Sequence, residues 1–328
     1  MPLAAANHGT ALVLLMAVMA LDIVIGLVPG FANIVPTRAT VFEALAAALE
    51  SRLNRAGRAR RDLVLRGVAV LMVLIVLALV VSLGLIYLSR VVPYGWGIEA
   101  LVLLLCISGR RVFFNLRRGS RIAASEDIEE GRRLVSILTG RDASKLDNFG
   151  LARVIVEMGG VGFLHGVMVP VFWYTLLGLP GLLVVRAVGH CAVVAAHRDR
   201  DGRMFSAVAA ALDHWISVVP SYIAAYLIAF SALVTPRARF AAALRVMSID
   251  AGRDAVINDG RVKGAVAGAL GLALGGPFGT KGGGPNDSWI GNGRARVGQS
   301  DIRQTFFLSL VAGLLTVAIV AVLTLVRA

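Results

Sequence analysis

The sequence predicts an all-α, polytopic integral membrane protein, with about five to eight transmembrane or re-entrant helices and additional amphipathic cytoplasmic helices. Hydrophobic residues make up 57% of the 328-residue chain and charged residues only 16%, and the mean hydropathy is +0.78. Long apolar runs recur along the chain, and arginines gather beside them. Soluble domains have a more polar composition than this.

Three apolar segments are the clearest membrane spans, at residues 11–28, 68–88 and 306–326. Each is close to the ~20 residues that cross a bilayer as a helix. The first lacks the basic start of a signal peptide, so it is expected to stay as an anchor. It also holds Asp22, which either pairs with an arginine elsewhere in the bundle or stays hydrated at the interface. We favour the interface.

Basic residues give the chain a formal net charge of +13, and they concentrate in loops next to the apolar segments. The loops span residues 31–67, 109–150 and 236–263 of a single membrane domain, residues 1–328. Short basic loops beside membrane spans stay in the cytoplasm. We therefore expect a multi-pass protein of the bacterial inner membrane, with these loops cytoplasmic and close to anionic lipid headgroups. Nucleic acid is not an expected partner.

Amphipathic patterns predict two helices on the membrane surface, at residues 39–53 and 126–138. Between them, the apolar run at residues 98–107 is short for a span. Extending it would bury Arg110 and Arg111, so we expect these two side chains to reach back to the interface.

The stretch at residues 154–190 is apolar, but it contains Glu157, His165 and repeated Gly and Pro residues. An ionisable group at membrane depth marks a functional site, and irregular backbone is tolerated there only where protein or a water-filled cavity satisfies it. We therefore expect a cavity in this stretch. Ser144 and Asp147 match a capping box, which predicts that a helix starts there and runs into the stretch.

Two later segments complete the chain. The apolar segment at residues 204–234 contains Pro220 and is too long for one untilted span, so it forms either a kinked helix or a tight hairpin. Residues 276–304 form a glycine-rich loop. Residues 280–282, Thr-Lys-Gly, lack the Ser or Thr that follows lysine in a Walker motif, so the loop is expected to be a connector rather than a phosphate-binding loop.

Polar residues that could take part in catalysis or ligand binding recur about once per apolar segment. The candidate site residues are Arg141, Asp142, Glu157, His165, Asp213, His214 and Asn258. If they converge, their carboxylates suit a magnesium-bound phosphate donor and the arginine suits the phosphoryl charge. The alternative is that they are paired structural charges within a helix bundle.

Two further residue types give weaker signals. His165, His190 and His197 have few carboxylates nearby, so no metal site is predicted from them. Cys106 and Cys191 lie in apolar surroundings, where we expect small buried hydrophobes.

Several short motifs follow one another in a specific order. Gly-Arg-Asp-x3-Leu-Asp occupies residues 140–147, Val-Glu 156–157, Gly-x3-Pro-x-Phe 166–172, Leu-Asp 212–213 and Asn-x-Gly 258–260. This ordered set resembles the adenosylcobinamide-phosphate synthase (CobD/CbiB) family, and the resemblance extends over nearly the whole chain.

The resemblance implies a cytoplasmic-membrane enzyme of cobalamin biosynthesis. Such an enzyme amidates adenosylcobyric acid, a corrinoid, with aminopropanol or its phosphate at the expense of ATP, so magnesium and ATP are the implied cofactors. The implied catalytic residues are Glu157, Asp142 and Asp213, and the implied substrate- or phosphate-binding residues are Arg141, Asn258, His165 and His214.

The chain also departs from the family pattern at polar positions. Val161, Gly162 and His165 stand where the family reads approximately Glu-Asn-x-x-Asp-Gly, residues 189–194 replace a motif with Asp and Ser, and His214 replaces the second of two Asp residues. These changes remove oxygen ligands suited to metal and phosphate. The alternative is therefore a non-catalytic relative, an accessory, assembly or regulatory (AmpE-like) membrane subunit, with a second membrane protein or another copy of the chain as partner.

Overall fold

The structure is a computed structural model, and almost all of the chain that it describes is helical. The described residues are 2–28, 45, 48–49, 60–194, 204–276 and 288–327. The surface helix predicted at residues 39–53 lies largely outside them.

The described helices follow one another along the chain, as the sequence predicts for an all-α protein. They are α1 (Pro2–Leu27), α3 (Arg60–Val91), α4 (Trp96–Cys106), α5 (Gly109–Ser125), α6 (Ile128–Thr139), α7 (Asn148–Phe163), α8 (Val169–Val194), α10 (Ala207–Ser231), α11 (Phe240–Ile249), α12 (Ile257–Leu270) and α13 (Gln299–Arg327). A π-helical turn, η2 (Leu164–Met168), joins α7 to α8, and a 3-10 helix, η3 (Ala251–Arg253), lies between α11 and α12. The strands β1 (Leu274–Gly275) and β2 (Trp289–Ile290) pair antiparallel, with Leu274 opposite Ile290.

Five helical segments of the described chain are long and apolar enough to cross a membrane. They are Thr10–Leu27, Arg61–Val91, Asn148–Val193, Ala207–Ser231 and Gln299–Val326. Each of the three segments predicted as clear spans lies in one of them, so the multi-pass prediction is confirmed. The segment around Pro220 is a single helix, α10, rather than a hairpin.

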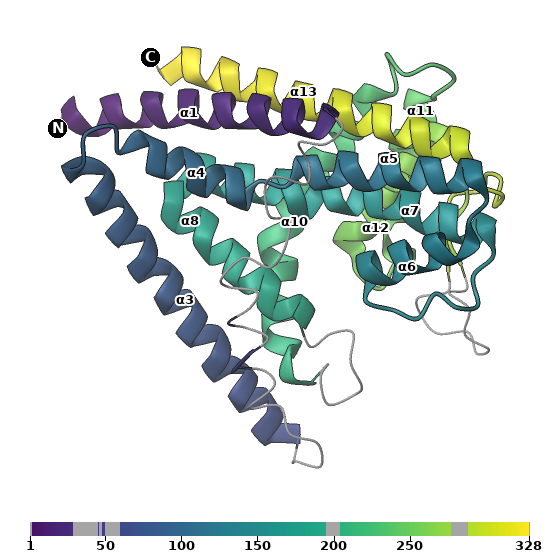
Figure 1. Ribbon diagram of the computed structural model, residues 1–328, viewed down its shortest axis with the longest axis horizontal. Helices are drawn as coiled ribbons and strands as arrows, with labels where there is room; N and C mark the ends of the chain where they lie inside the picture. The colour runs from purple at the N-terminus through teal and green to yellow at the C-terminus, as the bar shows by residue number, and fades with distance from the viewer. Residues whose placement is uncertain are drawn as a thin grey trace.

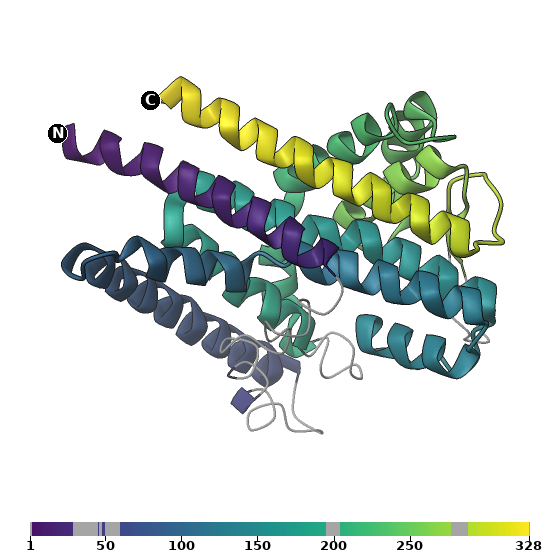
Figure 2. The same cartoon turned by 45° about the horizontal axis from the view of Figure 1, so that its top comes forward.

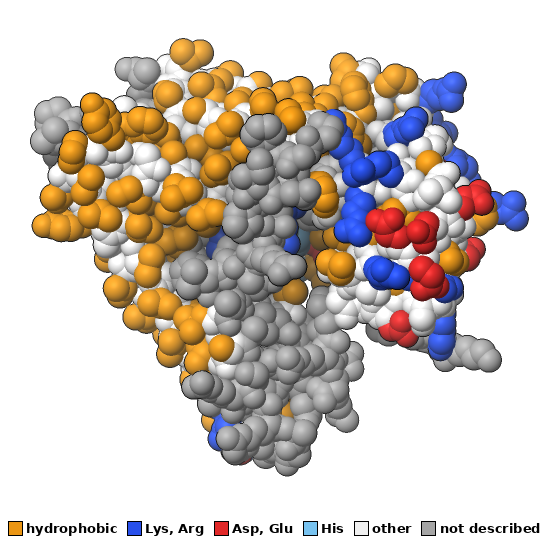
Figure 3. All heavy atoms as spheres, viewed as in Figure 1, with side chains coloured by type: hydrophobic (Ala, Val, Ile, Leu, Met, Phe, Trp, Pro, Cys, Tyr) orange, Lys and Arg blue, Asp and Glu red, His pale blue; other side chains and the backbone are white. Residues whose placement is uncertain are grey.

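The helices form an elongated bundle (Figures 1 and 2). Helices α1 and α13 run antiparallel, side by side, along one edge, and α3 leans away from the bundle. Hydrophobic side chains cover the half of the visible face that contains α3 and α4, whereas Lys, Arg, Asp and Glu gather over α5 and α6 (Figure 3). On α3, Met72, Val76 and Val80 are exposed, as expected of a helix that faces lipid.

The stretch from α7 to α8 is one apolar segment of 46 residues with two breaks. The helix changes from α to π across η2. Further on, Gly178 has φ +66° and ψ −151° inside α8. Glycine alone adopts this backbone conformation without strain, so the bend depends on Gly178. The prediction that glycines break the helical continuity is confirmed at Gly178, whereas Gly159, Gly160 and Gly162 lie within the continuous helix α7.

The expectations for Asp22 and Arg110 are wrong. Asp22 is only 2% exposed, and its Oδ1 lies 2.7 Å from Arg110 Nη1. The Arg110 amide also donates to Asp22 Oδ2 at 2.9 Å. Because the chain breaks between α4 and α5, a new helix starts at Gly109 and turns Arg110 inward rather than toward the interface. Asp22 therefore has the arginine partner that was the alternative.

The capping box predicted at Ser144 is also wrong. The N-cap of α7 is Asp147, whose side chain accepts a hydrogen bond from the Gly150 amide at 2.8 Å. Ser144 instead donates to the Asp142 carboxylate in the preceding loop at 2.9 Å. The second surface helix is confirmed as α6, and both cysteines are buried and free.

Two of the long helices begin inside polar segments of the sequence, residues 31–67 and 276–304. Helix α3 already begins at Arg60 and α13 at Gln299. Each helix has an acidic residue in its first turn, Asp62 and Asp301 respectively. A carboxylate there interacts favourably with the helix dipole, so each helix extends beyond its apolar run into polar sequence.

Candidate functional site

The structure brings five of the seven predicted site residues together where α7, η2, α10 and α12 meet. Glu157 comes from α7, His165 from η2, Asp213 and His214 from α10, and Asn258 from α12. Contacts through α12 and through Asp254, the residue that follows η3, connect these five. We call the whole group the polar cluster, which comprises Glu157, His165, Asp213, His214, Asp254, Asn258, Asp259, Arg261 and Lys263.

His165 and Asp259 form an ion pair at one side of the polar cluster, with 2.8 Å between Nε2 and Oδ1. Burial alone would raise the pKa of Asp259, but the charge and hydrogen bond of His165, together with Lys263, hold that pKa below its ordinary value. The carboxylate is therefore ionised at neutral pH, and His165 Nε2–H donates to it. Asp213 interacts electrostatically with both members of the pair.

Lys263 lies among the carboxylates at the other side. Its Nζ is 2.6 Å from Asp254 Oδ2 and 4.0 Å from Glu157 Oε2. Burial lowers the pKa of Lys263, but the negative charges of Glu157, Asp254 and Asp259 outweigh it and raise the pKa above its ordinary value. Glu157 Oε1 also accepts a hydrogen bond from the Gly275 amide at 2.7 Å, which ties β1 to α7.

Asn258 connects α12 to α10. Its Nδ2 donates to the His214 carbonyl at 2.7 Å, and its Oδ1 accepts from Arg261 Nη1 at the same distance. Arg261 also donates to Ser221 Oγ at 2.9 Å and lies over the Tyr222 ring, 3.9 Å from its centroid. Asn258 and Arg261 thus have several partners each and fix the two helices together.

The glycine of the Asn-x-Gly motif, Gly260, has a packing role. A Cβ atom at Gly260 would collide with the Ala251 carbonyl of η3. The backbone of α12 therefore approaches η3 as closely as glycine permits, and this contact sets where Asn258 and Asp259 point.

Asp142 and Arg141 lie elsewhere, in the exposed loop that follows α6. The Asp142 carboxylate accepts from the Ser144 amide and hydroxyl, both at 2.9 Å, and these hydrogen bonds lower the pKa of Asp142. The Arg141 amide donates to Thr139 Oγ1 at 3.2 Å. These contacts are local, and none of them joins the loop to the polar cluster.

Sequence reasoning missed four members of the polar cluster: Asp254, Asp259, Arg261 and Lys263. Asp259 and Lys263 are four residues apart, the spacing that places two side chains on one face of a helix. That spacing, directly after a predicted site residue, is the signal that could have identified them.

The polar cluster does not fit a resident magnesium ion. Among the described residues, no three His, Cys, Asp or Glu side chains form a group that could hold a metal. Asp259 is paired with His165, while Asp254 and Glu157 share Lys263. Magnesium requires oxygen ligands in near-octahedral geometry, and these oxygens are engaged by cations of the protein itself.

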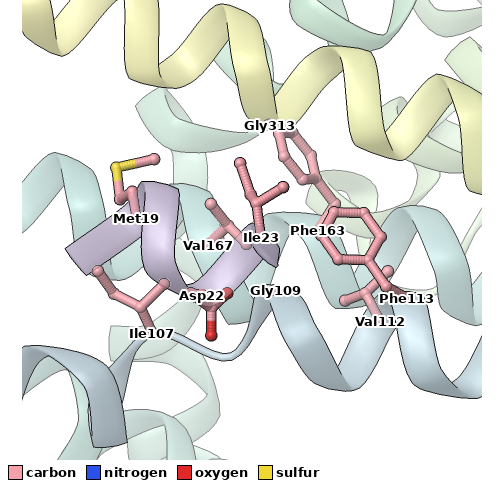
Figure 4. A pocket seen from close by; sticks show the side chains of 10 residues that line it. All are labelled: Met19, Asp22, Ile23, Ile107, Gly109, Val112, Phe113, Phe163, Val167 and Gly313. Carbon is pink, nitrogen blue, oxygen red and sulfur yellow. The ribbon is translucent and has the colours of Figure 1, made fainter. Parts of the chain in front are cut away.

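A small cavity lies between α1, α5, α7, η2 and α13 rather than within the cluster (Figure 4). Its lining residues are Met19, Asp22, Ile23, Ile107, Gly109, Val112, Phe113, Phe163, Val167 and Gly313. Its volume of about 10 Å³ is near the minimum that holds one water molecule. The cavity touches the predicted stretch at Phe163 and Val167, but Glu157 and His165 do not line it, so these two are satisfied by direct partners.

Comparisons with known proteins agree on one family. The family model described as CobD/Cbib protein matches residues 14–309. The cobalamin biosynthesis protein CobD of Rhodobacter capsulatus is 32% identical over 71% of this chain and 72% of its own length. Proteins of the same name from Photorhabdus laumondii and Brucella anthropi are 25% and 28% identical, over 84% and 81% of this chain and 87% and 82% of their own lengths. No solved structure matches significantly. The chain belongs to the CobD/CbiB family of cobalamin biosynthesis proteins.

Proposed function

We propose that the polar cluster is the site at which this protein joins a carboxylate of adenosylcobyric acid to aminopropanol or its phosphate as an amide, with ATP as the phosphoryl donor. The observation that supports this proposal is the convergence of carboxylates and cations from four elements at a break in an apolar helix. Ionisable groups at such depth are costly unless function requires them.

Amide formation from a carboxylate needs activation followed by amine attack. Phosphoryl transfer from ATP to the carboxylate gives an acyl phosphate and ADP. The amine then attacks the acyl carbon, the C–N bond forms, phosphate leaves and the amine loses a proton. The site must therefore supply a proton acceptor and positive charge for the phosphoryl oxygens.

The polar cluster contains groups for both tasks. In its neutral form, the His165 ring keeps Nε2–H bound to Asp259 and offers Nδ1 to accept the proton of the amine. Lys263 and Arg261 carry positive charge suited to phosphoryl oxygens. Glu157 orients Lys263, and Asn258 orients Arg261. Because the cluster does not fit a magnesium ion, magnesium has no step in this mechanism. The turnover assay is therefore run both with and without magnesium.

The alternative function is that of a non-catalytic accessory, assembly or regulatory subunit. One observation favours it. Asp254, Asp259 and Glu157 already have cationic partners within the protein, so the cluster is also consistent with paired charges that stabilise the bundle.

A turnover assay separates the two functions. The purified protein in detergent receives adenosylcobyric acid, aminopropanol or its phosphate, and ATP, with and without magnesium, and the amide product is followed by mass spectrometry. We expect ATP-dependent product from the wild type and none from Glu157→Ala, because this change releases Lys263 and the Gly275 amide. Asp142→Asn, outside the cluster, is the matched control.

Two results would count against the catalytic proposal. No turnover by the wild type, together with an unchanged cobinamide requirement in a deletion strain, supports the accessory function instead. Wild-type turnover in Glu157→Ala makes Glu157 a structural charge.

We also propose how the protein is oriented in the membrane. The charged half formed by α5 and α6 lies on the cytoplasmic side of a bacterial inner membrane. The arginines of α5 support this, because basic segments beside spans stay inside, where they also meet anionic lipid headgroups. A second membrane protein or another copy of the chain remains the proposed partner class. Reporter fusions in the loop after α6 test the orientation, and a periplasmic signal would contradict it.

A further inference from the structure

We infer that Arg186 is a positioning residue, whose guanidinium holds the π turn η2 and thereby keeps His165 against Asp259. The contacts of Arg186 are structural observations that do not depend on what the protein does. Only the catalytic role of His165 rests on the proposed function. Arg186 is neither one of the predicted site residues nor a member of the polar cluster.

The π turn leaves backbone carbonyls in need of donors. The Val169 amide donates to the Leu164 carbonyl, five residues back. The next donor along the chain would be Pro170, which has no N–H. The helical hydrogen bond to His165 in the π register, or to Gly166 in the α register, is therefore missing. Buried carbonyls without a donor are strongly disfavoured.

Arg186 provides the missing donors. Its Nη1 donates to the His165 carbonyl at 3.1 Å, and its Nη2 lies 3.4 Å from the Gly166 carbonyl. The same Nη2 contacts Ser108 Oγ at 3.2 Å and the Cys106 carbonyl at the end of α4. The Ser108 amide itself donates to the Gly166 carbonyl at 2.9 Å. One guanidinium thus joins two backbone breaks, η2 and the α4–α5 junction.

The bend at Gly178 explains how Arg186 reaches these atoms. Arg186 follows the bend on α8, and the returning second half of that helix brings its side chain back to η2. A planar guanidinium presents several donors in a fixed fork, whereas a lysine ammonium is a compact group on a flexible chain. A lysine at this position cannot donate hydrogen bonds to all of these carbonyls and the Ser108 hydroxyl at once.

The chemical reactivity of His165 tests this inference. Diethyl pyrocarbonate modifies accessible imidazole nitrogens, and mass spectrometry gives the rate for each histidine. The full-length protein in detergent is compared with Arg186→Met, Arg186→Lys and Asp259→Asn, the last of which gives the rate for an unpaired His165. The matched control is Arg117→Met, because Arg117 also donates to backbone carbonyls, those of Gly26 and Leu27 at the end of α1.

We expect Arg186→Met to raise the His165 rate about tenfold, toward that of Asp259→Asn, since a hydrogen bond to a charged group is lost. Arg186→Lys should lie between it and the wild type, and Arg117→Met should match the wild type. His214 is the internal reference, because global unfolding would accelerate both histidines. If Arg186→Met does not fold, Arg186→Lys carries the test with the same expected direction.

A wild-type His165 rate in a folded Arg186 variant would overturn the inference. Equal acceleration in Arg117→Met would also overturn it, because the effect would then be general loosening. The proposed function fails by a different observation, the absence of turnover in the wild type, which leaves the modification rates unchanged.

Discussion

The α1–α5 contact and the polar cluster both bury charges between helices, but they do so in different ways. At the first, one carboxylate and one guanidinium, Asp22 and Arg110, are 2% and 3% exposed. A Cβ atom at Gly109 would approach Asp22 Oδ2 to 2.6 Å, so no space is left for a substrate. This pair is closed and has a structural role.

The polar cluster is more open and its charges are less evenly matched. His165 and Lys263 lie among the carboxylates of Glu157, Asp213, Asp254 and Asp259. The His165 side chain is 34% exposed, against 2% for Asp22. The difference in exposure separates buried charges that stabilise the fold from charges that remain accessible to a substrate. Four predictions test this comparison.

The largest expected effect is on turnover. His165→Gln should lower kcat/KM about 10²- to 10⁴-fold, the usual contribution of a proton-transfer residue, while the thermal unfolding midpoint changes little. His190→Gln on α8 is the matched control and should keep wild-type turnover. An equal loss in both variants would show that His165 has no special role.

The next effect is on stability. Asp22→Ala should lower the free energy of unfolding by about 3–5 kcal/mol, because Arg110 is left buried without its counter-charge. Equilibrium unfolding in mixed detergent micelles measures this. The double change Asp22→Leu with Arg110→Leu should recover most of the loss, and a double variant as unstable as Asp22→Ala would contradict the pairing.

The free energy of unfolding should depend on pH through Asp259 and Lys263, two charged members of the polar cluster. The lowered pKa of Asp259 contributes stability that is fully present above its ordinary value of 3.8 and is lost as pH falls through the folded pKa. The raised pKa of Lys263 contributes stability that is fully present below 10.5 and is lost as pH rises through the folded pKa. Both contributions are therefore present between these two values.

Lys263→Met separates these two contributions. This variant should be less stable than the wild type at neutral pH by about 1–3 kcal/mol, the usual result of leaving buried polar groups without a partner, and should lack the additional loss at alkaline pH. Unfolding free energies measured across the pH range test this. Parallel curves for the two proteins would mean that Lys263 does not interact with the carboxylates in solution.

The smallest effect is expected outside both regions. Asp142→Asn should leave both the thermal unfolding midpoint and turnover unchanged, because Asp142 is exposed and its contacts are with Ser144. A large loss of turnover in Asp142→Asn would show that the loop after α6 contributes to the site.

The spans could be predicted from the sequence because each apolar run is local information. The same holds for the breaks around Gly178 and for His165 as an ionisable group within an apolar stretch. The partner of Asp22 could not be predicted, since Arg110 lies 88 residues away and only the break between α4 and α5 turns it inward. Hydropathy alone favoured the interface.

The site was predictable only in part for a related reason. Asp259 and Lys263 look like ordinary charges in a basic loop until the contact between Gly260 and η3 places α12 inside the bundle. Conversely, Asp142 stands in a motif that resembles the family pattern, yet its local turn with Ser144 accounts for its contacts. Charge type and spacing suggest candidates, but long-range packing decides which of them meet.

The bend at Gly178 also affects how the apolar segments of this chain are counted. The segment Asn148–Val193 has 46 residues, about twice the length that one helical span needs. Hydropathy therefore reads it as one continuous segment, whereas the non-helical backbone at Gly178 divides it into two arms. The two termini lie at the same end of the bundle (Figures 1 and 2).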